Sequence, residues 1–120
     1  MRFISRGTAL AWIALLFSGL AAAQTVERGS LTQGDATLRG GEYADSYVYA
    51  WEAGQRLILT LVSDEFDPYL IVRLPSGEQI ENDDWEGSPD ESRLDLDLEE
   101  DGKYTVIVTS FEEKETGEYI

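Results

Sequence analysis

The chain of 120 residues has room for one small domain, and it contains neither cysteine nor histidine. These absences exclude disulfide bonds, Ser-His-Asp and Cys-His catalytic arrangements, and zinc sites with nitrogen or sulfur ligands. With 24 acidic and nine basic residues the net charge is −15, which argues against nucleic acid or an anionic membrane surface as a partner.

The first 23 residues have the pattern of an export signal. Arg2 and Arg6 precede an apolar run, residues 8–20, and three alanines, residues 21–23, supply the small side chains that a signal peptidase requires. The run of about 13 residues is shorter than the roughly 20 that a membrane-spanning helix needs. We therefore predict a signal peptide over residues 1–23 and a secreted or periplasmic domain over residues 24–120, free of the membrane after cleavage. Seven basic residues then remain against 24 acidic ones, a net charge of −17.

Hydrophobic residues in the predicted mature chain recur with a period of two, which is typical of β-strands. The clearest strand covers residues 93–99, where three leucines alternate with charged residues. Further sets of this kind are Leu57, Leu59 and Leu61; Leu70, Val72 and Leu74; and Tyr104, Val106 and Val108. Glycine-containing turns separate these runs. The pattern predicts an all-β chain, an antiparallel sandwich of immunoglobulin or jelly-roll type with about seven to eight strands.

Aromatic residues alternate along the segment "YADSYVYAW" at Tyr43, Tyr47, Tyr49 and Trp51. Their spacing places them on one face of a strand, and we expect most of them to lie in the core. Trp51, at the end of the segment beside a turn, is the candidate for exposure.

The acidic residues do not predict an enzyme. Acid–base catalysis by carboxylates needs two groups held in environments that separate their pKa values. A surface rich in solvated acidic residues gives no sign of this, and no glycine-rich phosphate loop precedes a helix. We therefore expect the chain to be non-catalytic.

An acidic segment, "NDDWEG", follows the predicted strand around Leu70 to Leu74. Asn82, Asp84 and Glu86 stand at alternate positions before a glycine, as in the first half of an EF-hand loop, but the twelfth position is Arg93 rather than glutamate. Two interpretations remain. The first is a Ca²⁺ site formed by Asp67, Asn82, Asp83, Asp84 and Ser92, and the second is a solvated turn whose side chains cap backbone amides.

Several short motifs occur together over residues 29–120. They are Asp45, Tyr47 and Tyr49; Ala53-Gly54; Asp67-Pro68-Tyr69-Leu70; Asn82-Asp83-Asp84; Ser92; Gly102-Lys103-Tyr104; and Gly117-Glu118-Tyr119. In this combination the chain resembles the bacterial pre-peptidase C-terminal domain, an accessory β-sandwich found beside secreted proteases and other exported enzymes. The resemblance implies a jelly-roll sandwich, and some related collagen-binding domains hold calcium. The family pattern continues its last strand beyond Ile120, so we expect that strand to be shortened or the chain to continue.

From these observations we expect an exported, non-catalytic accessory or binding module with Ca²⁺ as a candidate structural ion. Its partner would be a protein or polysaccharide of unknown identity, or a linked peptidase domain. The alternative is a carbohydrate- or protein-recognition module that uses Trp51, Tyr69 and Trp85 as exposed stacking platforms. A third class, a stand-alone glycosidase, requires two carboxylates facing each other across a cleft.

Overall fold

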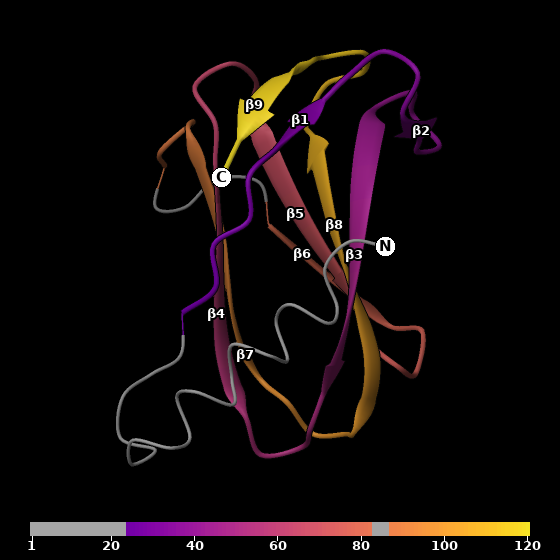
Figure 1. Cartoon of the computed structure of the whole chain (residues 1–120), viewed down its shortest axis with the longest axis vertical. Helices are drawn as coiled ribbons and strands as arrows, with labels where there is room; N and C mark the ends of the chain where they lie inside the picture. The colour runs from indigo at the N-terminus through magenta and orange to yellow at the C-terminus, as the bar shows by residue number, and fades with distance from the viewer. Residues whose placement is uncertain (1–23, 83–86) are drawn as a thin grey trace.

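The computed structural model describes residues 24–82 and 87–120, and within these ranges the regular structure is entirely β. The predicted signal peptide lies outside the described residues. Nine strands follow one another along the described part of the chain (Figure 1). They are β1 (Gly29–Leu31), β2 (Ala36–Thr37), β3 (Tyr43–Trp51), β4 (Arg56–Val62), β5 (Pro68–Arg73), β6 (Gln79–Asn82), β7 (Glu91–Asp97), β8 (Gly102–Ser110) and β9 (Gly117–Tyr119).

The strands form two antiparallel layers. One is a five-stranded sheet in the order β2-β3-β8-β5-β6. The other contains the pairs β1-β9 and β4-β7. Two backbone hydrogen bonds between Val62 and Ile120, of 2.9 and 3.0 Å, join these pairs into the order β1-β9-β4-β7. Because strands far apart in the sequence interleave in both layers, the fold is a jelly roll. This confirms the predicted class, and the two-residue β2 is too short to have been recognised from alternation.

The core lies between the layers and follows the alternation of the sequence. Leu94, Leu96 and Leu98 are buried, whereas Asp95 and Asp97 between them are exposed. Tyr104, Val106 and Val108 of β8 are buried from the opposite layer, and Val72 of β5 has an exposed fraction of 0 %. The antiparallel register of β8 with both β3 and β5 places β8 at the centre of the larger sheet.

Different turns and connections lie at the two ends of the sandwich. The β3–β4 and β7–β8 turns lie at one end, and the β8–β9 connection lies at the other (Figure 1). Strands β6 and β7 are the outermost strands of their layers. A pocket opens between these two edge strands, beside the β7–β8 turn.

Candidate functional site

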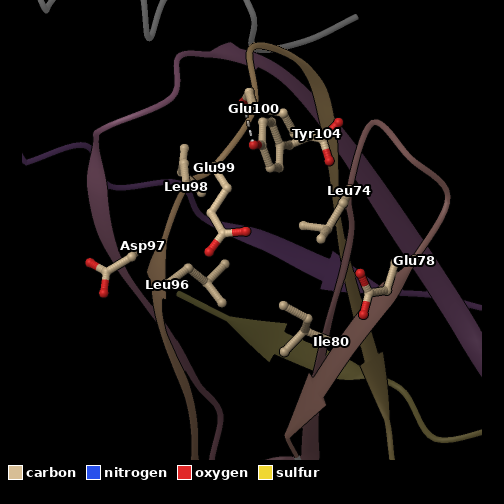
Figure 2. A pocket seen from close by; sticks show the side chains of 9 residues that line it. All are labelled: Leu74, Glu78, Ile80, Leu96, Asp97, Leu98, Glu99, Glu100 and Tyr104. Carbon is tan, nitrogen blue, oxygen red and sulfur yellow. Dashed lines mark hydrogen bonds between the residues drawn. The ribbon is translucent and has the colours of Figure 1, made fainter.

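A pocket of about 250 Å³ lies between the β5–β6 hairpin and the end of β7 (Figure 2). It takes side chains from both layers of the sandwich and from the start of β8. The lining residues are Leu74, Glu78, Ile80, Leu96, Asp97, Leu98, Glu99, Glu100 and Tyr104. We refer to this hollow as the edge pocket.

The floor of the edge pocket is apolar. Leu96 of β7 reaches it because the alternation of the strand turns this side chain inward, and Leu98, just after β7, is buried on the same side. Leu74 and Ile80 arrive from the other layer through a tight turn, in which Leu74 N donates to Glu78 O at 2.8 Å. Gly77 occupies this turn with φ of 98°, a conformation that favours glycine. Leu74 and Ile80 are only partly buried, so the floor presents apolar surface to the opening.

The β7–β8 turn that closes one end of the edge pocket is held at several points. Tyr104 OH donates to the carbonyl oxygen of Glu100 at 2.6 Å, and this bond is drawn in Figure 2. Ala53 N donates to Asp101 Oδ1 and Gly54 N to Leu98 O, both at 2.8 Å. Two of the sequence motifs, Ala53-Gly54 and the segment beginning at Gly102, therefore meet at this end of the fold.

The rim of the edge pocket is acidic. Glu78 comes from the β5–β6 hairpin, and Asp97, Glu99 and Glu100 come from the end of β7 and the turn after it. In Figure 2 the carboxylate of Glu99 reaches toward the space between Leu96 and Leu74, whereas Asp97 points away from it. Within the described ranges, the carboxylates of Glu78, Glu99 and Glu100 have neither a hydrogen bond nor an ion pair. Asp97, in contrast, has Arg56 as its strand partner across β4 and β7. The negative charge at the mouth that has no ion pair therefore comes from the three glutamates.

Three of the five residues predicted to bind calcium, Asp67, Asn82 and Ser92, are among the described residues. Ser92 is fully buried, and its hydroxyl donates to the carbonyl oxygen of Asn82, which ties β7 to the end of β6. Asp67 stands three residues before Leu70, the strand partner of Asn82. The Oδ1 atoms of Asp67 and Asn82 are both buried. Asp83 and Asp84 lie outside the described residues.

Across residues 24–82 and 87–120, no three acidic side chains converge closely enough to hold a metal ion. The Ser92 hydroxyl donates its proton to the carbonyl oxygen of Asn82, which is a structural hydrogen bond. Of the five predicted ligands, the structure thus brings Asn82 and Ser92 into direct contact, through the backbone of one and the side chain of the other.

Two of the three predicted aromatic platform residues, Trp51 and Tyr69, lie on opposite faces of the five-stranded sheet. Trp51 points inward, where it stacks on Tyr49 at a ring-centroid distance of 4.9 Å and contacts Tyr104 at 5.5 Å. Tyr69 lies on the outer face of the same sheet, and its hydroxyl donates to Glu81 Oε1 at 2.7 Å. Trp85 lies outside the described residues. Trp51 and Tyr69 therefore cannot form one stacking surface.

Phe111 is an aromatic residue that sequence reasoning missed. It directly follows β8, its exposed fraction is 53 %, and its ring stacks with that of Tyr69 at 6.2 Å. The sequence could have indicated its exposure, because Phe111 directly follows the alternating run of β8. Tyr69 and Phe111 form an aromatic pair on the outer face of the five-stranded sheet.

A second polar cluster ties the opposite end of the sandwich together. Tyr119 OH donates to Asp45 Oδ2 at 2.6 Å and is hydrogen-bonded to Tyr47 OH at 2.5 Å. Burial, followed by the hydrogen bond to Asp45, raises the pKa of Tyr119 well above its usual value. Gly29 allows this approach, because a Cβ there would overlap the Tyr119 hydroxyl. The cluster connects β1 and β9 to β3, so these motif residues have a structural role.

No helix among the described residues is long and apolar enough to cross a membrane. No protein-family model, curated protein or solved structure matches this chain. Function is therefore inferred from the geometry and chemistry of the sandwich.

Proposed function

We propose that the chain is an exported, non-catalytic accessory module that binds a partner macromolecule at the edge pocket. The observation that carries this proposal is an open apolar floor, formed in part by Leu74 and Ile80, beneath three glutamates whose carboxylates form no ion pair among the described residues. Concave apolar surface with a few polar groups around it is typical of binding sites. With such a site, a small sandwich domain can bind a partner without catalysing a reaction.

The arrangement of the motif residues supports an accessory role of the pre-peptidase C-terminal type. Asp45 and Tyr47 meet Tyr119, which is 74 residues from Asp45 in the sequence. Ala53 meets Asp101 in the same way across the two turns. These contacts join distant parts of the sandwich, and a jelly-roll sandwich is the fold that the resemblance implies.

The non-catalytic part of the proposal rests on the residues available. The chain has no histidine or cysteine to activate a nucleophile. Glu78, Glu99 and Glu100 share one solvent-open rim, whereas acid–base catalysis needs carboxylates in contrasting environments. The rim is better suited to attracting a cation than to exchanging protons.

A binding and turnover screen tests this function. The exported chain would be added to cationic, anionic and neutral polypeptides and polysaccharides, with binding followed by calorimetry and hydrolysis by product release. We expect saturable binding of at least one polymer and no product from any of them. Turnover that disappears on changing a single carboxylate would show an enzyme, and the absence of all binding would contradict the module.

We propose further that Ca²⁺ binds beside Asp67 and Asn82 and stabilises the fold. Both side chains place a buried oxygen near the end of the β5–β6 pair, and Asn82 Oδ1 has no hydrogen-bond partner among the described residues. No lysine or arginine occurs between Arg73 and Arg93, so the acidic segment lacks a local countercharge. Hard oxygen ligands of this kind suit Ca²⁺.

If calcium binds only the folded state, a concentration one hundred times its dissociation constant adds about 2.7 kcal/mol to the free energy of unfolding. For a domain of this size the melting temperature should rise by roughly 10 °C. The measurement is thermal unfolding at fixed ionic strength, with Mg²⁺ in place of Ca²⁺ as the ion control. Asp67→Asn should reduce the shift, and Asp64→Asn, which removes an exposed charge nearby, should retain it. If both ions raise the melting temperature equally, or if Ca²⁺ does so equally in both variants, the acidic segment is a solvated turn and not a calcium site.

A second candidate function uses the pair Tyr69 and Phe111. The exposed ring of Phe111 beside a half-buried tyrosine is a surface on which a sugar ring can stack. In the same screen, a polysaccharide that binds through this pair should lose affinity in Phe111→Ala and keep it when the rim carboxylates are changed. The opposite result would favour the edge pocket.

A further inference from the structure

We propose that the edge pocket receives a lysine or arginine side chain of a partner polypeptide. This inference rests on the proposed binding function and names the chemistry of the partner. A long cationic side chain has an apolar stem and a charged end, and it commonly packs the stem on apolar surface while the charge stays near water. The edge pocket has the complementary arrangement, with an apolar floor and an acidic mouth.

The size of the edge pocket favours a side chain over a complete small molecule. Its volume of about 250 Å³ is below the 300–1,000 Å³ or so that is usual for pockets that enclose drug-sized ligands. Leu74, Ile80 and Leu96 approach one another from the two layers and line the hollow with aliphatic groups (Figure 2). A stem of several methylenes is the group that such a floor accommodates.

The rim favours an organic cation, such as an ammonium or guanidinium group, over a metal ion. Glu78 and Glu99 come from opposite walls of the edge pocket (Figure 2). Within residues 24–82 and 87–120, no three acidic groups are close enough to coordinate a single ion. Carboxylates spaced around an opening suit an ammonium or guanidinium group, which can approach one of them while the others attract it at longer range.

The strands beside the edge pocket indicate a polypeptide as the source of that cation. Strand β6 ends the order of the five-stranded sheet, and β7 ends the order of the other layer. Edge strands offer backbone donors and acceptors to an extended chain, and alternate side chains of such a chain can enter adjacent pockets. A basic peptide in extended conformation along β6 would therefore contact both the strand edge and the edge pocket.

The probe for this inference is hexalysine, compared at pH 6.5 with a hexamer of 2,4-diaminobutyric acid. Both peptides carry six protonated side-chain amines at this pH, but the second has two methylenes per side chain in place of four. Affinities would be measured by calorimetry with the exported chain, and we expect hexalysine to bind about ten-fold more tightly because its stem reaches the apolar floor.

Two isosteric triple variants locate the contact. Glu78→Gln, Glu99→Gln and Glu100→Gln neutralise the rim, and Glu112→Gln, Glu113→Gln and Glu115→Gln remove equal charge from the β8–β9 connection at the other end of the sandwich. The rim variant should weaken hexalysine binding about ten-fold or more, and the control variant by about two-fold or less.

Equal affinity for the two hexamers, or equal losses in the two variants, would reduce the interaction to diffuse charge attraction and overturn the inference. So would the absence of hexalysine binding. If the screen above still finds a polymer without basic side chains that binds, the binding-module function is retained and only the basic partner is excluded. Thermal unfolding of both variants serves to confirm that they remain folded.

Discussion

Replacing Tyr119 with alanine is expected to lower the free energy of unfolding by about 3–5 kcal/mol, because it empties a buried aromatic site between the layers. The side chain has an exposed fraction of 4 %, and its ring contacts Phe66 in an edge-to-face arrangement. Its removal also leaves Tyr47 and Asp45 without the hydroxyl that joins them. Urea unfolding followed by tryptophan fluorescence measures the loss.

Tyr119→Phe separates the hydroxyl from the ring and should cost about 1–3 kcal/mol, since it leaves buried polar groups without this partner. Because the pKa of Tyr119 is raised in the folded state, the native chain keeps this proton at pH values where the unfolded chain loses it. Its contribution is therefore complete below the unfolded value of about 10 and falls above it by at most about 1.4 kcal/mol per pH unit. The variant should lack this part of the alkaline loss. A loss below about 1 kcal/mol with an unchanged pH profile would mean that the hydroxyl network contributes little.

Gly117→Ala is expected to destabilise the fold by about 2–4 kcal/mol, from backbone strain together with overpacking. Gly117 has φ of 147°, and a Cβ there would overlap the Cβ of Glu65. Gly34 is the matched control, because its φ is 107° but no heavy atom lies within 4 Å of an added Cβ. Gly34→Ala should therefore cost only the strain. Equal losses of stability in the two variants would show that the contact with Glu65 relaxes freely.

The strands of this protein could be predicted from alternation alone because each layer of the sandwich has one buried face. Leu94, Leu96 and Leu98 differ from their neighbours in polarity at every step, and they are buried as expected. The same signal could not show β2, whose two residues are both exposed. Alternation placed Trp51 on the same strand face as Tyr49, but its expected exposure was wrong, because its ring stacks on that of Tyr49 and packs against the core.

The candidate site was not predictable in the same way, because it depends on which strands become neighbours. The edge pocket joins Leu74 and Ile80 to Leu96 and Glu99 only through the outermost positions of β6 and β7 in their layers. Local polarity carries no information about that order. The acidic segment around Asn82 was noticed in the sequence by its charge density, whereas the rim of the edge pocket joins Glu78 of the β5–β6 hairpin to acidic residues at the end of β7.

Methyl NMR of the exported chain titrated with hexalysine tests the central claim, that the edge pocket is the binding site, most directly. Leu74, Ile80 and Leu96 provide methyl groups inside the edge pocket, and Ile58 provides a control on β4, with an exposed fraction of 52 % and Asp95 as its strand partner. The structure predicts saturable shifts at the three pocket residues and little change at Ile58. Shifts of equal size at Ile58, or none at Ile80 and Leu96, would contradict binding at the edge pocket.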